Sequence, residues 1–472
     1  MLKKTLFVCF ALLSLCAYVR AQGGYSSASM GLSREASGLG IIPPPDAIRV
    51  EEYLNYHKHQ LSMPEKGQAA RMDLRWGCDK INSFSSEAVL QIGFTTLPQN
   101  ADNSVIPPLN IGLVVDKSGS MNDFRKIHKV REALLSFLEG LRPDDIFSIS
   151  VFDNDSQVIF PSQKVGNKNT ARIAIESIAA NGATNINSGL LDGLKQVEKK
   201  LDPKYTNAVI LLTDGIANQG EADPEKILQN AAQYLDKGII LSTIGVGRDL
   251  NHGMLRNLAK KGKGQVHFLA DSADVKKVFV QELEALLSPK ARNVSLSIEN
   301  STDLSIQDIY GYEPRIDQNR VTFELDNMNA GLTQVLLIKY SLANNLSNPP
   351  VSIPVTVTWS YDDITQSGKK ITEKRELLLH YAPQEGRKLN MLLDPEVRKN
   401  YSIALMAQSI KQMAKMHYEG KTEQAEDCID ITIGQIKSLF PAYRDPDLTR
   451  MLHIIERYAS AFDQYRMTKP LD

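Results

Sequence analysis

Residues 111–120 read IGLVVDKSGS and decide the fold of the central part of the chain. Five residues without a polar side chain lead directly into a polar stretch that starts at Asp116. A continuous apolar run is typical of a strand that is buried on both faces of a parallel sheet. We therefore expect residues 111–115 to form an inner strand, with Asp116 at its carboxyl end.

Strands and helices alternate from this stretch to about residue 289. Further apolar runs predict strands at 146–152, 208–212, 239–246 and 266–269. Amphipathic patterns between them predict helices at 124–141, 171–180, 187–201, 224–236, 254–261 and 273–287. Such alternation predicts a doubly wound α/β domain with a mainly parallel, Rossmann-like sheet over residues 107–289.

The segments on either side of this domain have different patterns. Residues 290–383 contain short alternating strands separated by turn residues, which predicts a β-sandwich domain. Residues 46–106 contain a predicted helix at 46–60, followed by strands within 71–98 that have no sheet of their own. We expect these strands to pair with those of 290–383, so that the α/β domain is inserted into a split sandwich.

The sequence pattern of residues 384–472 predicts a helical C-terminal region. Methionine and aromatic side chains recur there at helical spacing, which indicates the core of a small bundle. His57 and His59 fall near the end of the predicted N-terminal helix. On a helix, two residues at this spacing point apart, so we interpret both histidines as surface residues and not as metal ligands.

The first 45 residues have the pattern of an export signal and a leader. Residues 1–21 combine a basic start, a short apolar run and small side chains before Gln22, which indicates a cleavable signal peptide. Residues 22–45 are rich in Gly and Ser and predict a flexible leader. An uncleaved anchor and a lipid anchor at Cys16 are the alternatives. We expect export to a periplasm, to the cell surface or out of the cell.

The composition of the 472 residues narrows the function classes. Lys and Arg total 54 against 55 Asp and Glu, a formal net charge of −1, so the chain lacks the basic excess of a nucleic-acid-binding protein. No segment after the signal is apolar over the ~18 residues that indicate a membrane span. Cys78 and Cys428 are far apart in sequence, and we expect them to be unpaired.

Three polar motifs lie next to predicted elements of the α/β domain. They read DKSGS at 116–120, GATN at 182–185 and TDG at 213–215. Doubly wound sheets place ligands at the carboxyl ends of their strands, so we expect the three motifs on one rim. Together they offer two carboxylates and three hydroxyls. An oxygen-only set of this kind suits Mg²⁺ or Mn²⁺ and does not suit a soft metal.

The candidate metal ligands are Asp116, Ser118, Ser120, Thr184 and Asp214. Their three hydroxyls can coordinate an ion directly, while the two carboxylates act through bound waters. A direct shell with so little negative charge leaves the ion electrophilic, with one position for an incoming anionic oxygen. An Asp or Glu carboxylate of a partner protein is the expected ligand at that position.

This set of motifs resembles the metal-ion-dependent adhesion site (MIDAS) of von Willebrand factor A (VWA) domains, and the resemblance covers residues 107–289. Residues 44–56 are also similar to a segment that precedes the VWA domain in a group of exported bacterial proteins. The resemblance implies a module that binds proteins or assembles complexes and is not a catalyst. We expect Mg²⁺ as the ion, with Mn²⁺ or Ca²⁺ as alternatives.

Two other functions stand as alternatives. A structural component of a cell-envelope complex could carry the same ion passively. A metal-dependent hydrolase is disfavoured, because the sequence contains no HExxH, GxSxG or phosphate-binding loop and nominates no general base. The leading hypothesis is therefore an exported protein-binding module that depends on a divalent cation.

Overall fold

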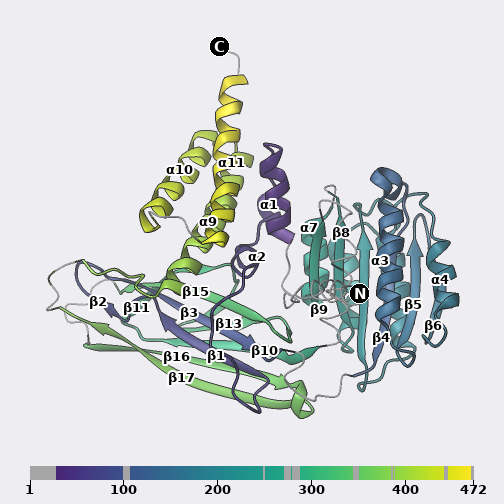
Figure 1. Cartoon of the computed structure of the whole chain (residues 1–472), viewed down its shortest axis with the longest axis horizontal. Helices are drawn as coiled ribbons and strands as arrows, with labels where there is room; N and C mark the ends of the chain where they lie inside the picture. Colours follow the sequence, from purple (N-terminus) through teal and green to yellow (C-terminus); the bar gives the residue numbers. More distant parts are fainter. Residues whose placement is uncertain are drawn as a thin grey trace, which may run out of the picture.

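The computed structural model describes residues 28–98, 107–247, 250–269, 278, 288–343, 350–383, 386, 388–440 and 445–468. The predicted signal peptide and, apart from Val278, the predicted helix at 273–287 lie outside the described residues. Figure 1 shows an α/β domain beside a β-sandwich, with a group of helices over the sandwich. Within the described ranges, no helix combines the length and apolar character that crossing a membrane requires.

A six-stranded sheet forms the centre of the α/β domain. Its spatial order is β6 (Ser156–Lys164), β5 (Ile146–Phe152), β4 (Leu109–Asp116), β7 (Thr206–Thr213), β8 (Ile240–Val246) and β9 (Lys263–Leu269). All neighbouring strands run parallel except β5 and β6, which are antiparallel. The predicted doubly wound, mainly parallel sheet is therefore confirmed. The order of the strands along the chain reverses between β4 and β7, so the topological switch point lies between these two strands.

Helices cover both faces of this sheet. One face is covered by α3 (Lys126–Gly140) and α4 (Asn169–Glu176), and the other by α5 (Ile186–Glu198), α6 (Pro224–Leu235) and α7 (His252–Lys261). Side chains of β4 alternate between the two cores, with Val115 on the α3 side and Val114 on the α5 side. Helix α5 lies so close to β4 that a Cβ atom at Gly193 would overlap Cγ2 of Val114.

Two antiparallel sheets form the sandwich. The four-stranded sheet is ordered β1 (Ala70–Trp76), β3 (Glu87–Thr96), β15 (Thr333–Leu342), β11 (Leu304–Tyr310). The larger sheet is ordered β12 (Arg315–Asp317), β13 (Arg320–Glu324), β10 (Pro289–Asn300), β16 (Ser352–Asp363), β17 (Lys369–Tyr381), β2 (Lys80–Ile81), with β14 (Met328–Asn329) beside β10. Among the described strands of the sandwich, only the short β2 runs parallel to its neighbour, β17. Phe94 and Trp359 meet between the sheets, with ring centroids 5.3 Å apart.

The predicted pairing of the N-terminal strands with the sandwich is confirmed. β3 lies between β1 and β15, and Ile92 is opposite Leu336 in the ladder. The chain leaves and re-enters the sandwich at neighbouring points. The carbonyl of Leu97 accepts a hydrogen bond from the N–H of Gly331 at 3.0 Å, and the carbonyl of Ser288 accepts one from the N–H of Ala330 at 2.8 Å. The α/β domain is therefore an insertion between two adjacent strand ends.

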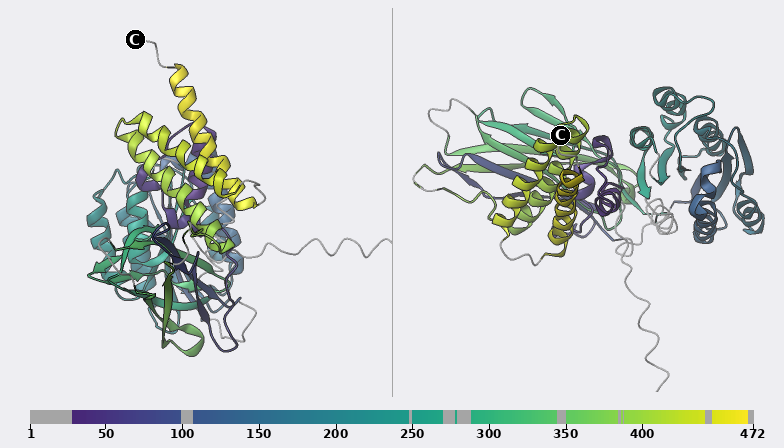
Figure 2. Two further views of the ribbon diagram at one scale, coloured as in Figure 1. Left: turned by 90° about the vertical axis from the view of Figure 1, so that its left-hand side faces the viewer. Right: turned by 90° about the horizontal axis from the view of Figure 1, so that it is seen from above.

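Five helices form a bundle on the outer face of the smaller sheet. They are α1 (Ala28–Gly38), α2 (Val50–Leu54), α9 (Pro395–Tyr418), α10 (Thr422–Leu439) and α11 (Pro446–Thr468). Their core continues into the sheet through Val89, Val335 and Leu337. The views in Figure 2 show α9, α10 and α11 over the sandwich, whereas α1 also contacts β9 at the edge of the α/β domain sheet.

The prediction of a flexible leader is wrong for residues 28–38, which are helical. Residues 28–38 form α1, in which Met30 is buried against the bundle and Ser33 contacts the hydroxyl of Tyr53. The helix predicted at 46–60 is also shorter than expected, because a 3-10 turn at Pro45–Ala47 and α2 replace it. In both cases packing against distant helices decides the local conformation.

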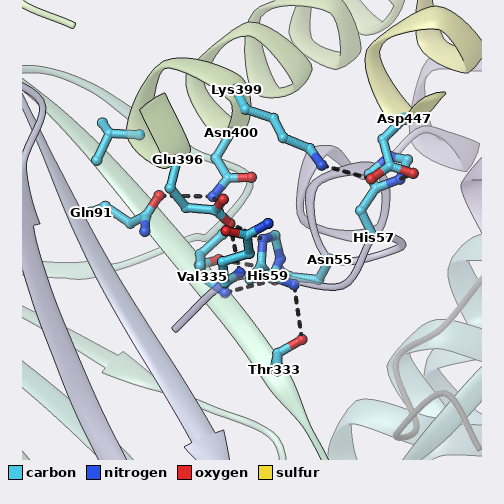
Figure 3. A network of polar contacts seen from close by, with 12 residues as sticks. Asn55, His57, His59, Gln91, Thr333, Val335, Glu396, Lys399, Asn400 and Asp447 are labelled. Atoms are coloured by element: carbon cyan, nitrogen blue, oxygen red, sulfur yellow. Dashed lines mark hydrogen bonds and ion pairs between the residues drawn. The ribbon is translucent and has the colours of Figure 1, made fainter. Parts of the chain in front are cut away.

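The interpretation of His57 and His59 as surface residues is also wrong, since both are buried. The chain leaves the helical conformation at Asn55, so the two rings do not diverge as on a helix. His57 Nδ1 lies 3.0 Å from Asp447 Oδ1 of α11, and His59 Nδ1 lies 3.7 Å from Glu396 Oε1 of α9 (Figure 3). Burial lowers the pKa of His59, and its contact with Glu396 opposes that shift.

These contacts fasten the N-terminal segment to the bundle and do not build a metal site. Among the described residues, no group of three or more His, Cys, Asp or Glu is arranged to hold a metal ion. Cys78 and Cys428 are free, in agreement with the prediction that they are unpaired.

One buried arginine ties the α/β domain to the N-terminal segment. Arg256 of α7 donates to the carbonyl of Asp46 at 2.7 Å and to that of Ala47 at 3.2 Å. Its guanidinium also lies 3.3 Å from the Glu52 carboxylate, and both side chains are less than a tenth exposed. The inserted domain is therefore anchored by a charge pair in addition to its two chain connections.

Candidate metal centre

The sheet register brings the first and third motifs together. β4 and β7 are parallel neighbours in which Val115 is opposite Leu212, so Asp116 and Thr213 come next along the two strands. The hydroxyl of Thr213 donates to Asp116 Oδ2 at 2.6 Å, and Asp214 follows as the first residue beyond β7. These two motifs, predicted on one rim of the sheet, lie at the carboxyl ends of β4 and β7, which are neighbouring strands.

Asp116 is a fully buried carboxylate with both oxygens engaged. Besides the Thr213 contact, Oδ1 accepts a hydrogen bond from the backbone N–H of Ser118 at 2.8 Å. Burial raises the pKa of Asp116 to about 6, although these hydrogen bonds and that of the Ser118 side chain oppose the shift. A positive ion at the rim would favour the ionised carboxylate again, so the environment of Asp116 fits a neighbouring cation.

Ser118, Ser120 and Asp214 form a chain of oxygens above Asp116. The two serine hydroxyls are 3.2 Å apart, and Ser120 Oγ donates to Asp214 Oδ1 at 2.8 Å. Ser118 and Asp214 are buried, whereas Ser120 is exposed. The oxygens therefore run from the interior of the domain to its surface, as a site that contacts an outside ligand requires.

Thr184 joins this group through the loop that precedes α5. Its Oγ1 lies 3.4 Å from the position that a Cβ atom would take on Gly215. Its N–H donates to Asn218 Oδ1 at 2.8 Å, and the N–H of Gly119 donates to the carbonyl of Gly182 at 2.9 Å. Gly182 has a φ of +80°, which favours glycine there. Hydrogen bonds from backbone N–H groups thus hold the three motif loops together.

Lys126 also belongs to the site, although no sequence motif marks it. Its Nζ donates to Asp214 Oδ2 at 2.6 Å and lies 3.4 Å from the carbonyl oxygen of Ser120. A lysine at the start of a helix carries no motif signal, and only the fold shows that its ammonium reaches the carboxylate of another loop. Asn218, which holds the Thr184 loop, was missed for the same reason.

The chemistry of the donors fits a hard divalent cation. Ser118, Ser120 and Thr184 would supply hydroxyl oxygens, and Asp116 and Asp214 would supply carboxylates at the same rim. Such oxygen donors match Mg²⁺ or Mn²⁺, and they lack the thiolate or imidazole groups that soft ions prefer. Because Asp116 is fixed by two hydrogen bonds, it would act by orienting a bound water more readily than by rotating toward the ion.

Comparisons with known proteins identify the α/β domain. Residues 110–281 match the family model described as von Willebrand factor type A domain. Over 300 residues the chain is 29% identical to a protein of Escherichia coli (strain K12) with the name Uncharacterized protein YfbK, covering 62% of this chain and 52% of that protein. It is 31% identical over 209 residues to inter-alpha-trypsin inhibitor heavy chain H3 of Mus musculus, covering 43% of this chain and 23% of that protein.

The chain therefore spans about half the length of the first relative and about a quarter of the second. Among solved structures, a von Willebrand factor type A protein from Catenulispora acidiphila has a TM-score of 0.56 at 14% identity. The match covers 84% of this chain and 98% of that one, so the shared fold extends beyond the α/β domain.

Proposed function

We propose that this protein binds a protein partner through a divalent cation, because residues 110–281 match the family model described as von Willebrand factor type A domain, a module that typically mediates interactions between proteins. The cation would be held by Asp116, Ser118, Ser120, Thr184 and Asp214. When bound, it supplies a positive charge for an Asp or Glu carboxylate of the partner.

The observation that carries this proposal is the contact of the Ser118 and Ser120 hydroxyls with each other and with Asp214, beside buried Asp116 and open to the surface at Ser120. Hydroxyl ligands leave most of the positive charge of an ion uncompensated, which favours an anionic oxygen from outside. Ile216, two residues after Asp214, has 52% of its surface exposed and would offer an apolar contact for the partner near the charged one. A carboxylate flanked by an apolar side chain is therefore the partner chemistry that the rim fits best.

We propose binding and not catalysis as the role of this rim. Three described ionisable groups contact the candidate ligand oxygens: Asp214 and Lys126, which pair with each other, and Asp116, whose two oxygens are engaged by the chain itself, while Lys117 is paired with Asp153. None of the three is available as a general base for a substrate in this arrangement. We further propose that the protein is exported, on the basis of the signal pattern at 1–21.

A passive structural role is the second candidate. One observation favours it: the Lys126–Asp214 pair neutralises one carboxylate of the rim, so the rim can keep its shape without an external ligand. In that case the protein would assemble with its partners in the same way with or without the ion.

Calorimetric titration with Mg²⁺ tests the ion site. The purified protein should bind one Mg²⁺, and Asp116→Ala should weaken this binding by about 10- to 100-fold, as is typical for groups that orient metal-bound waters. Asp236→Ala removes an acid that pairs with Lys261 at the exposed end of α6 and should leave the affinity unchanged. Equal Mg²⁺ binding by all three proteins would contradict the assignment of these ligands.

A pull-down from a native membrane fraction tests the binding role. Partners should be recovered in Mg²⁺ and lost in EDTA or with Asp214→Ala. Converting the carboxyl groups of that fraction to amides, with a carbodiimide and excess amine, should abolish recovery as well. Recovery that is independent of the ion would favour the passive role, and recovery that survives amidation would remove the carboxylate from the proposal.

A further inference from the structure

We propose that Lys126 is a tethered cation that competes with the divalent ion for Asp214 and thereby sets the affinity of the metal centre. This inference deepens the proposed function and rests on it. Its basis is the contact between Lys126 Nζ and Asp214 Oδ2 at 2.6 Å, while Oδ1 of the same carboxylate accepts from Ser120. Both oxygens of Asp214 are therefore engaged before any ion arrives.

The position of Lys126 is not explained by its own helix. Lys126 is the first residue of α3, and the preceding residue, Arg125, has a left-handed backbone with a φ of 57° and no capping hydrogen bond from its side chain. A positive charge at the N-terminus of a helix opposes the helix dipole. The local element thus disfavours a cation here, and the contact with Asp214 is what compensates for it.

The ion pair is shielded from solvent. The side chain of Asp214 is fully buried and that of Lys126 is 14% exposed. Nζ also lies 3.7 Å from where a Cβ atom would stand on Gly247, so the first residue after β8 packs close to the ammonium. Water and salt screen such a pair far less than a surface ion pair.

A divalent ion held by Asp214 and Ser120 would come within several ångström of Nζ, because Nζ touches one oxygen of the same carboxylate. Repulsion between the two cations at such a separation weakens ion binding by a factor on the order of ten, even with strong dielectric screening. In the ion-free protein the same ammonium stabilises the buried carboxylate. Lys126 therefore stabilises the ion-free protein and destabilises the ion-bound protein.

These opposite effects allow a test that distinguishes the proposed role from that of a purely structural lysine. In Lys126→Met, the Mg²⁺ affinity measured by calorimetry should rise about tenfold, while the melting temperature in EDTA should fall by a few degrees. Lys126→Arg keeps the charge and should retain an affinity close to that of the wild type. Lys237→Met breaks an exposed ion pair with Glu198 elsewhere in the domain and should leave the Mg²⁺ affinity unchanged.

The outcomes separate this inference from the function on which it rests. Equal or weaker Mg²⁺ binding by Lys126→Met, with clear binding by the wild type, would overturn the role of Lys126 and leave the metal centre in place. Absence of Mg²⁺ binding by the wild type and by Lys126→Met alike would overturn the metal centre, and this inference with it.

Discussion

Both oxygens of the Asp116 carboxylate accept hydrogen bonds from within the chain, from Ser118 and from Thr213. The carboxylate therefore keeps one orientation whether or not an ion is present, and no partner has to order it. Asp214 is oriented by the hydroxyl of Ser120 on Oδ1, while Lys126 occupies Oδ2 and is proposed to compete with the ion there. At the scale of single residues, the proposed site is thus preorganised, which lowers the entropy cost of binding.

A second residue-scale feature is the pairing of Asp447 with His57 and Lys399. The hydrogen bond from His57, followed by that from Lys399, holds the pKa of Asp447 well below its usual range. A lowered native pKa means that folding favours the ionised form. Its contribution to stability is present above the unfolded pKa of about 4 and is lost as the pH falls through the native pKa.

We therefore predict that Asp447→Asn lowers the free energy of unfolding by about 1–3 kcal/mol at pH 7, because it removes the ionised partner of two buried or half-buried side chains. The difference from the wild type should shrink as the pH falls below about 4. Denaturant unfolding at several pH values measures it. Asp427→Asn, at an exposed position on α10, is the control and should change little. A gap that stays constant from pH 7 to pH 3 would contradict the assigned role.

At the scale of elements, α5 positions the Thr184 loop by its close approach to β4. Gly193 makes that approach possible, because a Cβ atom there would overlap the side chain of Val114. The sequence predicted both elements, yet the distance between them follows from a single missing side chain. A shift of α5 would move Thr184 away from Asp214.

We predict that Gly193→Ala lowers the free energy of unfolding by about 1–3 kcal/mol through overpacking, and weakens Mg²⁺ binding because α5 is displaced. The double variant with Val114→Ala should recover part of both effects, since the two residues contact each other. Gly434→Ala on α10 is the matched control. It meets no atom within 4 Å and should leave stability unchanged or raise it by up to about 1 kcal/mol. Additive effects of the two substitutions at 114 and 193 would refute this account.

One element of the α/β domain was not predicted. β6 carries mostly exposed or half-exposed side chains and pairs only with β5 at the edge of the sheet. A strand at the edge of the sheet is less buried than the inner strands. It therefore lacks the continuous apolar run that identifies them. Its existence depends on the neighbour that it pairs with.

At the scale of the whole molecule, the sandwich is closed by strands from two distant parts of the chain. β15 has β11 on one side and β3 on the other, so residues 290–383 alone contain only part of the smaller sheet. The fragment would expose the apolar edge and faces that β1, β3 and the bundle cover in the full chain.

We predict that a fragment of residues 290–383 does not fold into a stable monomer, because an exposed apolar sheet with unpaired strands aggregates. A protein in which a short Gly-Ser linker replaces residues 98–287 should fold, since Leu97 and Ser288 lie at neighbouring strand ends. Circular dichroism and size-exclusion chromatography of the two proteins compare these outcomes. A soluble, cooperatively unfolding 290–383 fragment would contradict the split sandwich.

Local sequence pattern was sufficient to predict the α/β domain, the sandwich and the C-terminal helices, together with the donor oxygens of the rim. Apolar runs without alternation identify the inner strands, and alternating runs identify the sandwich, because burial on two faces or on one leaves a local pattern. Asp116, Ser118 and Ser120 lie within five residues, so their shared position at the end of β4 could be read directly. Thr184 and Asp214 followed from the rule that parallel strands present their carboxyl ends on one edge.

Only the tertiary structure decided which distant groups touch these elements. It showed the ammonium of Lys126 on Asp214, the burial of His57 and His59, and the ordered helix at 28–38. Each of these depends on contacts between residues far apart in the chain, and such contacts leave no periodic pattern in the local sequence. Local pattern fixed the elements and the donor oxygens. Packing placed the ammonium of Lys126 beside these oxygens, and this charge sets the ion affinity proposed for the site.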